Sequence, residues 1–356
     1  MRFLSVIFVT LLSFTVSAWA CPFCSPTNSD LFTITKNSNA VCKVQRVGQG
    51  KFKILQVIKG KAKVGKIVIA GEPDRSAGGE QRILLLATIA NPSQPYWSEP
   101  VRALTPQEYK FITALLQTAD ENKQRDLAAA NLLSKSTIIE DAAYGILALA
   151  PLEAVQKRLS LSSRKGLMAA INDPKKLKER KSLYLLMLLP SVTPKDKDWV
   201  RGLMFRPRPD PLAAYFPALM AAYARAAGSS GVKEMAQVLL NERTSVSESF
   251  NPTSGFTFIG TESEDPRVRD AARAVIRGEL AYPERAVFVI PPLAKWKDYS
   301  AAPQVEKLAY SNADTPWVVG SVVRYFRSFD SAATKKALQR LTKEFPDIVE
   351  ANVRPY

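Results

Sequence analysis

Two cysteines near the start of the chain, Cys21 and Cys24, enclose Pro22 and Phe23 in a CxxC motif. Cysteines at this spacing can form a reactive dithiol, a metal clamp, a haem attachment site, a lipid anchor or a structural disulfide. Haem attachment requires a histidine directly after the second cysteine, and the chain has no histidine at all. A zinc site needs two further ligands, and one cysteine, Cys42, is all that remains. The residues present therefore favour a disulfide.

Thiol–disulfide exchange is the catalytic alternative for this motif. A thioredoxin-like dithiol places its first cysteine where a helix follows a buried strand, because that position lowers the pKa of the thiol. No strand precedes Cys21, and residues 25–28 are typical of a loop. We therefore predict a structural disulfide, either Cys21–Cys24 or one of these two with Cys42. The longer pairing would stabilise the fold by about 3 kcal/mol, and the sequence does not choose between them.

The segment before the motif has the pattern of an export signal. A basic start is followed by a mostly apolar run over residues 3–16, and Ala18-Trp19-Ala20 provides small residues for a signal peptidase. The run is shorter than a membrane span, and no later stretch reaches that length without charges. Residues 1–20 are thus predicted to be a cleaved signal peptide, and the protein to be periplasmic or extracellular. A lipid anchor on Cys21 is disfavoured, because Ala18 stands where leucine is usual.

Composition narrows the function classes. Lys and Arg total 49 against 33 Asp and Glu, a formal net charge of +16. Such a chain favours anionic surroundings, whether a phospholipid or lipopolysaccharide surface, a nucleic acid or an acidic polymer. The absence of histidine excludes Ser-His-Asp and Cys-His catalysis. Carboxylate pairs and Ser-Lys dyads remain open, so an enzyme is disfavoured, and we predict no cofactor and no metal.

Residues 21–104 predict a β module, expected to be a small barrel or sandwich. Residues 40–47 and 51–58 are β-branched runs separated by Gly-Gln-Gly, which is a hairpin signal, and residues 64–70 and 82–88 add two strands. The segment Gly60–Ile67 resembles a P-loop, but Ile67 stands where Ser or Thr must reach Mg²⁺. It is instead a Lys-rich turn, and no nucleotide site is predicted.

From Thr105 onward the hydrophobic period is helical. Thr105 to Glu108 combines an N-cap, a proline at N1 and the glutamate of a capping box. An acidic residue, small residues and a branched apolar pair recur at residues 126–133, 141–147 and 270–276. Residues 265–274 resemble a HEAT-repeat helix, with Val268 and Arg269 at the expected places. Residues 105–356 are therefore predicted to form an irregular HEAT-like helical array with a long loop at about 241–264, giving an α+β protein of two parts.

A run of cations follows Asp173, which is expected to cap a helix. Cations at a helix N-terminus oppose the helix dipole, so the run is either a solvated face or a site for an anion. Arg206 and Arg208 would join this run of cations if the array brings neighbouring helix ends together. The candidate anion-binding residues are Lys175, Lys176, Lys178, Arg180, Lys181, Arg206 and Arg208. A second cluster, with Trp296, Asp298, Tyr299, Trp317, Arg324 and Tyr325, predicts helix packing or a groove for a sugar or peptide.

Several segments together resemble one uncharacterised family of exported proteins found mainly in planctomycete-type bacteria. The resemblance covers most of the mature chain and implies export and architecture, with no activity. Cys42 departs from the two-cysteine pattern of that family. The segments that carry the resemblance are ACPFC at 20–24 and residues 52–60, 140–144, 150–155, 172–184 and 291–299.

More faintly, the β module resembles the barrel of netrins and metalloproteinase inhibitors. Those inhibitors tie their N-terminal cysteines to later ones, and no cysteine follows Cys42 here. Taken together, the sequence predicts an exported, non-catalytic binding or scaffold protein of the cell envelope with an unidentified protein partner. The alternatives are an envelope polyanion-binding protein that uses basic helix ends, and a thiol–disulfide oxidoreductase that uses Cys21 and Cys24.

Overall fold

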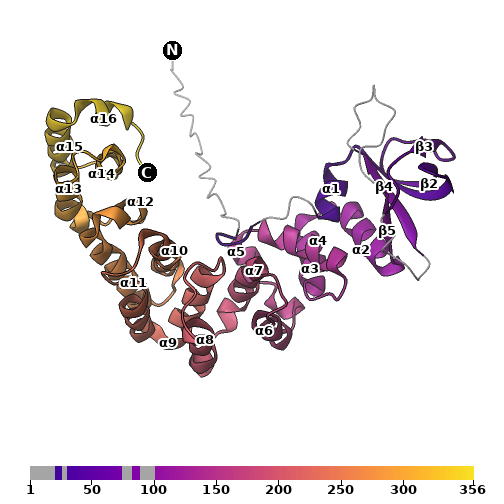
Figure 1. The fold of residues 1–356 in the computed structure, drawn as a ribbon, viewed down its shortest axis with the longest axis horizontal. Helices are drawn as coiled ribbons and strands as arrows, with labels where there is room; N and C mark the ends of the chain where they lie inside the picture. Colours follow the sequence, from indigo (N-terminus) through magenta and orange to yellow (C-terminus); the bar gives the residue numbers. More distant parts are fainter. Residues whose placement is uncertain (1–20, 26–29, 74–81, 89–100) are drawn as a thin grey trace, which may run out of the picture.

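The computed structural model describes residues 21–25, 30–73, 82–88 and 101–356, so the predicted signal peptide lies outside the described residues. These residues form an arc, with a small sheet at one end and helices along the rest of its length (Figure 1). The α+β class is confirmed. Within the described ranges, every helix is too short or too polar to cross a membrane.

The sheet has five antiparallel strands in the order β3-β2-β1-β4-β5. The predicted hairpin is confirmed, because Gly48 pairs with Lys51 across a turn in which Gly50 has a φ of +62°. The expected barrel is wrong: the described strands form one open sheet, since two of the five have three residues and are too short to close it. The strands are β1 (Ala40–Gly48), β2 (Lys51–Gly60), β3 (Ile67–Ile69), β4 (Ile83–Thr88) and β5 (Arg102–Leu104).

The helices follow one another along the arc. The α-helices are α1 (Leu31–Asn37), α2 (Pro106–Gln117), α3 (Glu121–Asn131), α4 (Thr137–Ala148), α5 (Leu152–Gln156), α6 (Arg164–Asn172), α7 (Lys178–Leu188), α8 (Lys197–Phe205), α9 (Phe216–Leu239), α10 (Val246–Glu262), α11 (Pro266–Gly278), α12 (Ala286–Lys295), α13 (Ala302–Ser311), α14 (Pro316–Arg327), α15 (Ala332–Glu344) and α16 (Pro346–Ala351). Short 3₁₀ turns are η1 (Leu159–Leu161), η2 (Leu189–Ser191), η3 (Pro194–Asp196), η4 (Glu279–Ala281), η5 (Pro283–Arg285) and η6 (Tyr299–Ala301).

Packing in the array is local in sequence. The main helix pairs, such as α3 with α4, α9 with α10 and α10 with α11, are one or two helices apart. One continuous apolar core nevertheless runs from Cys21 to Val349. This is the stacking expected of a repeat array, in which each helix buries its apolar face on its neighbours. The resemblance to HEAT repeats itself remains a prediction.

The predicted loop at 241–264 is wrong, because α10 occupies Val246–Glu262. Its glycines serve close packing: a Cβ at Gly255 would lie 2.6 Å from Met220 Sδ, and one at Gly260 would lie 2.8 Å from the Trp296 ring. Pro252 lies inside the helix although it removes one backbone donor. Tertiary packing therefore outweighs the low helix propensity of these residues.

The junction between the sheet and the array is held by the buried carboxylate of Glu108. The predicted capping box is confirmed: Glu108 Oε2 accepts from the Thr105 N–H at 2.8 Å, and Thr105 Oγ1 accepts from the Glu108 N–H at 3.2 Å. The second oxygen, Oε1, accepts from the hydroxyl of Ser136 at 2.6 Å, and Ser136 is the N-cap of α4. One side chain thus fixes the starts of two helices.

We expect Glu108→Ala to lower the free energy of unfolding by about 3 kcal/mol, because it leaves a backbone N–H and a hydroxyl without their acceptor. Thr105→Ala should cost about 1 kcal/mol, the usual loss for an N-cap. Glu121→Ala is the control, since that exposed glutamate pairs with Arg125 within the first turns of α3 and should cost less than about 0.5 kcal/mol. Denaturant titration followed by circular dichroism measures all three; equal losses for Glu108 and Glu121 would contradict the assignment.

Candidate functional site

The CxxC motif closes a tight loop on the inner side of the arc. Cys21 and Cys24 form a disulfide with their Cα atoms 5.3 Å apart, and the Cys24 N–H donates to the Cys21 carbonyl at 3.2 Å. Cys42 is the free cysteine, fully buried in β1. Of the pairings that the sequence left open, the structure has the short one, Cys21–Cys24. Burial raises the pKa of the Cys42 thiol to about 11, so this thiol is unreactive at neutral pH.

The N-terminal segment is anchored to two helices that lie far from it in the sequence, α10 and α4. The ring of Phe23 meets that of Phe258 in α10 edge-on, with centroids 5.2 Å apart. The Tyr144 hydroxyl, in α4, lies 3.3 Å from both the Ser25 carbonyl and the Glu179 carbonyl in α7. The disulfide loop is therefore part of the wall of the array.

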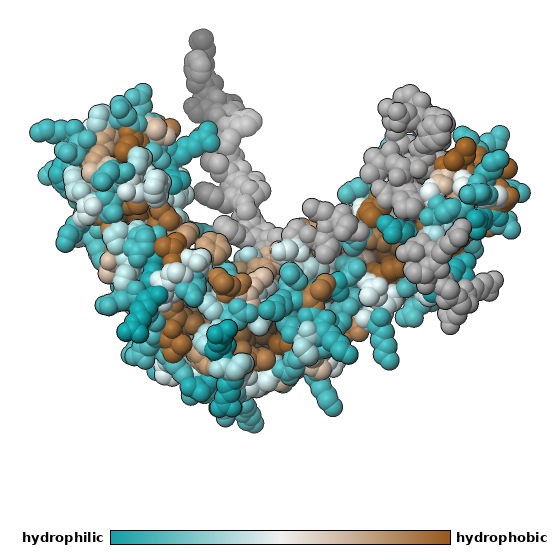
Figure 2. Space-filling view, in the orientation of Figure 1, coloured by the Kyte–Doolittle hydropathy of each residue, from teal (hydrophilic) through white to brown (hydrophobic). Residues whose placement is uncertain are grey.

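Beside this loop lies a groove of about 540 Å³, which is within the size range of small-ligand and peptide sites. Figure 2 shows apolar residues (brown) along the inner side of the arc where the groove lies. The N-terminal loop, the start of α5 and the helix α12 form its walls with Pro22, Phe23, Pro151, Leu152, Glu153, Phe288, Pro292 and Lys295. One face of α10 forms its floor with Phe250, Thr253, Ser254, Thr257, Phe258, Thr261 and Glu262.

The floor residues recur every three or four positions, so they form one stripe along α10. From Phe250 to Glu262 the helix rises about 18 Å, the length of five or six residues of extended chain. Phe250 meets Phe288 of α12 edge-on at 5.4 Å, two turns from the Phe23–Phe258 contact. Aromatic contacts thus bound an elongated trough.

Two of the four hydroxyl groups of the floor are engaged by the helix itself. The Ser254 hydroxyl donates to the Phe250 carbonyl at 2.9 Å, and that of Thr261 donates to the Thr257 carbonyl at 2.8 Å. Two polar groups differ. The buried hydroxyl of Thr253 has no hydrogen-bond partner among the described residues, and the carboxylate of Glu262 makes no ion pair among them. The groove therefore offers apolar surface with one unpaired carboxylate, not an activated nucleophile. Within the described ranges, no cluster of Cys, Asp and Glu could hold a metal ion.

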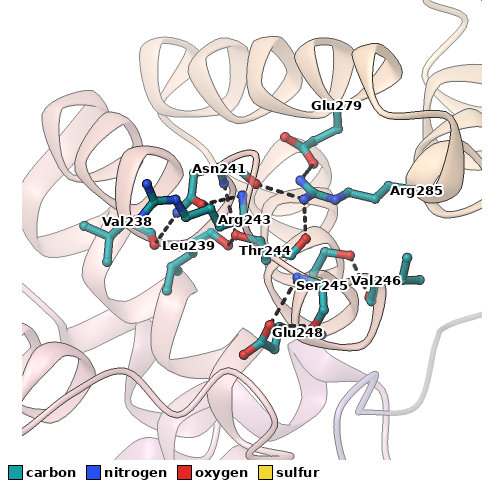
Figure 3. A network of polar contacts seen from close by, with 11 residues as sticks. Val238, Leu239, Asn241, Arg243, Thr244, Ser245, Val246, Glu248, Glu279 and Arg285 are labelled. Carbon is teal, nitrogen blue, oxygen red and sulfur yellow. Dashed lines mark hydrogen bonds and ion pairs between the residues drawn. The ribbon is translucent and has the colours of Figure 1, made fainter.

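The start of α10 is held in place by Arg285, which is completely buried (Figure 3). Its guanidinium pairs with Glu279 at 2.9 Å and stacks on the Tyr282 ring at 4.3 Å. It also donates to the backbone carbonyls of Asn241, at 2.9 Å, and Thr244. Those carbonyls belong to the connection between α9 and α10, so Arg285 ties that connection to the segment that leads into α12. Arg285 therefore supports both α10, the floor of the groove, and α12, one of its walls.

A second buried charge lies on the other side of the N-terminal loop. Glu140, in α4, accepts hydrogen bonds from Lys176 at 2.7 Å and from the Tyr184 hydroxyl at 2.9 Å, and pairs with Arg180 at 3.1 Å. Arg180 also pairs with Asp141. Burial, and then the nearby Glu140 charge, raise the pKa of Tyr184. This network joins α4 to α7.

Two of the candidate anion-binding residues, Lys176 and Arg180, are thus neutralised by carboxylates of α4. The expected N-cap at Asp173 is wrong, because Asp173 ends α6 and accepts from the Lys175 N–H at 2.8 Å. The chain turns there, and α7 begins only at Lys178.

The other cations of the run are separate from this network. Lys178 lies 3.4 Å from Asp210, which places the 206–210 connection beside the start of α7. Burial lowers the pKa of Lys181, whose ammonium lies over the Tyr215 ring. Arg206 and Arg208 are exposed. Lys178 and Lys181 thus already have partners. Anion binding by this set stays a prediction.

The aromatic cluster near the C-terminus is divided between packing and surface. The guanidinium of Arg277 pairs with Asp298 at 2.6 Å, and the Tyr325 hydroxyl donates to the Asp298 carbonyl at 2.6 Å. Trp296 donates to Thr261 and thereby supports the groove floor. Trp317, in contrast, is 68% exposed.

The fold and the groove define a class of protein: a curved array of helices with an antiparallel sheet at one end and a disulfide-closed loop on its inner side. Comparison with family models, with curated proteins and with solved structures finds no significant match to this chain.

The floor of the groove was missed by sequence reasoning, because α10 falls in the segment predicted to be a loop. Two signals could have found it. Ser245 and Glu248 form a capping box, with the Glu248 carboxylate accepting from the Ser245 N–H at 3.1 Å. After it, aromatic and hydroxyl residues recur at helical spacing from Phe250 to Thr261.

The state of the three cysteines is directly testable. In the native, unreduced protein we expect almost no thiol that reacts with dithionitrobenzoate near pH 8. Cys42 is buried, and this pH is far below the pKa of its thiol. Denaturant should release one thiol per chain, and denaturant with a reductant all three. Two fast-reacting thiols in the native protein would show that Cys21 and Cys24 are not paired.

Removing the Arg285 side chain should be far more costly than removing an exposed arginine. We expect Arg285→Leu to lower the free energy of unfolding by about 3–5 kcal/mol, because Glu279 is left buried without its partner. Adding Glu279→Leu should recover part of that loss. Arg201→Leu is the control, since its pair with Glu234 is half-exposed and its loss should lower the free energy of unfolding far less. Denaturant titration measures the cycle, and similar losses at both arginines would refute the assignment.

Proposed function

We propose that the protein is an exported, non-catalytic binding protein of the cell envelope that holds an apolar segment of a partner protein in the groove beside its disulfide loop. The observation that carries this proposal is the groove itself. Phe250 is 52% exposed on the inner side of the arc, beside the partly buried rings of Phe23 and Phe288, and a monomer gains nothing from leaving this apolar surface in water. Its length suits an extended peptide or a short helix.

The assembly of the groove supports a shared purpose for distant segments. Three of the stretches that carry the family resemblance contribute to its walls: Pro22-Phe23, the start of α5 at Pro151–Glu153, and Pro292 with Lys295 in α12. A fourth, which contains Tyr144, anchors the disulfide loop. Helix packing alone would not require these segments to line the same groove.

The charge of the groove favours a neutral or basic apolar segment. Although the chain carries a formal charge of +16, the lining contains Glu153 and Glu262 against one lysine. Glu153 is paired with Lys157, so Glu262 is the carboxylate available to a ligand. A polyanion would be repelled from it.

The two alternative functions receive less support. In the polyanion alternative, Lys176 and Arg180 are already paired with buried Glu140. In the oxidoreductase alternative, catalysis requires an accessible cysteine with a lowered pKa, but Cys21 is buried in the core and the loop is fixed by Phe23. A structural disulfide is also what an oxidising compartment outside the cytosol permits, which supports the proposal of export.

Peptide display against the purified protein tests the proposal. Selected peptides should combine aromatic or aliphatic residues with a lysine or arginine, and a labelled representative should bind in fluorescence anisotropy. Phe250→Ala with Phe288→Ala should weaken binding at least tenfold, as for central aromatic contacts. Glu262→Gln should weaken peptides that contain the basic residue and spare those that lack it.

Trp317→Ala is the matched control, because it removes an exposed aromatic residue outside the groove and should leave affinity within twofold. If Trp317→Ala abolished binding and the phenylalanine variants did not, the groove would not be the binding site. Selection of acidic peptides would contradict the proposed role of Glu262.

A further inference from the structure

The outer face of the hairpin β2–β3, at the end of the arc opposite the C-terminus, exposes large apolar side chains. Val64 is 59% exposed, Ile67 56% and Ile69 54%, and Leu55 of the neighbouring strand is also exposed. Figure 2 shows brown residues between teal ones at this end of the molecule. The groove does not include any of these residues, so its ligand does not account for their exposure.

The strand register explains why Leu55, Ile67 and Ile69 share one face, while Val64 lies in the turn that joins the two strands. Lys51 lies opposite Ile69, and Lys53 opposite Ile67. Directly opposed residues of antiparallel strands point to the same side of a sheet. The residues between them in sequence, such as Phe52 and Val68, are buried on the other side. The outer face is therefore a small surface on which lysine and isoleucine side chains lie directly beside one another.

The charge of this region is strongly one-sided. Residues 31–71 contain nine lysines and arginines and no aspartate or glutamate. Three of these cations already have partners. Arg46 is paired with Glu72, Lys59 donates to a backbone carbonyl at the C-terminal end of α1, and Lys43 lies over the Tyr109 ring. No ion pair among the described residues neutralises the remaining exposed lysines of the hairpin, which are Lys51, Lys53, Lys61, Lys63 and Lys66.

This combination distinguishes between anionic partners. A soluble polyanion uses the lysines and gains nothing from exposed isoleucine, whereas a bilayer offers anionic headgroups with hydrocarbon directly beneath them. We propose that the outer face of β2–β3 binds the surface of a membrane that contains anionic lipids, with Val64, Ile67 and Ile69 inserted between headgroups and the hairpin lysines on the phosphates. This site is separate from the groove and does not depend on its proposed function.

Vesicle co-sedimentation tests the proposal on the chain from residue 21 to 356. The protein should bind vesicles of phosphatidylcholine with about one third phosphatidylglycerol, and should not bind vesicles of phosphatidylcholine alone. Each lysine near an anionic surface contributes about a fivefold change in partitioning. Lys51→Gln, Lys53→Gln and Lys63→Gln together should therefore weaken binding more than tenfold. Ile67→Ser with Ile69→Ser should also weaken it more than tenfold at unchanged net charge.

The control removes the same charge from the exposed surface of the helical array, with Lys165→Gln, Lys195→Gln and Lys233→Gln, and should stay within threefold of the unmodified protein. Leu55→Ser probes the same face from the longer strand, in case the isoleucine variant loses β3. An equal loss from the control triple would show that net charge alone drives binding. Unchanged vesicle binding by both apolar variants would show that the lysines alone bind the anionic groups, as they would in a soluble polyanion, and that no side chain inserts. Absence of binding to anionic vesicles would refute the membrane site.

Discussion

A fully buried guanidinium cannot be left without partners, because its charge then costs several kcal/mol, and this constraint organises the centre of the molecule. Arg285 meets it with one carboxylate, from Glu279, and with carbonyl oxygens of the connection between α9 and α10. The same requirement fixes where α10 begins and how α12 follows η5. The groove lies between these two helices, so its width is set by a contact outside it. Glu140 has the corresponding role at the N-terminal loop, where it joins α4 to α7.

Between these two supports, small residues and a disulfide shape the inner surface of the arc. Gly255 and Gly260 allow α10 to approach Met220 and Trp296 closely, and the stripe of α10 between these two contacts forms the groove floor. The four-residue loop that the disulfide closes restricts the unfolded chain only slightly, since the entropic effect of a crosslink grows with loop length. Its contribution is local: it presents Pro22 and Phe23 as a rigid edge of the groove.

Local sequence signals predicted local structure well. The capping box at Thr105, the hairpin at Gly48–Lys51 and the disulfide class of the CxxC motif depend on residues close together in sequence. The failures involve tertiary contacts. The helix α10 contains glycine and proline because it packs closely, and composition alone cannot distinguish that use from a loop. Likewise, the partners of Lys176 and Arg180 come from a helix about forty residues earlier. The groove unites segments from residue 22 to residue 295, which no spacing in the sequence reveals.

The stacking of each helix on its near neighbours also has a mechanical consequence. Apart from the N-terminal loop, which bridges α4 and α10, the main contacts join helices that are near neighbours, so a bend of the arc divides into small rotations at many interfaces. The molecule is then an elastic arm, stiff along each helix and compliant along its length. A load applied between the two ends of the arc would be taken up as curvature outside the part that the N-terminal loop braces, before the groove was deformed.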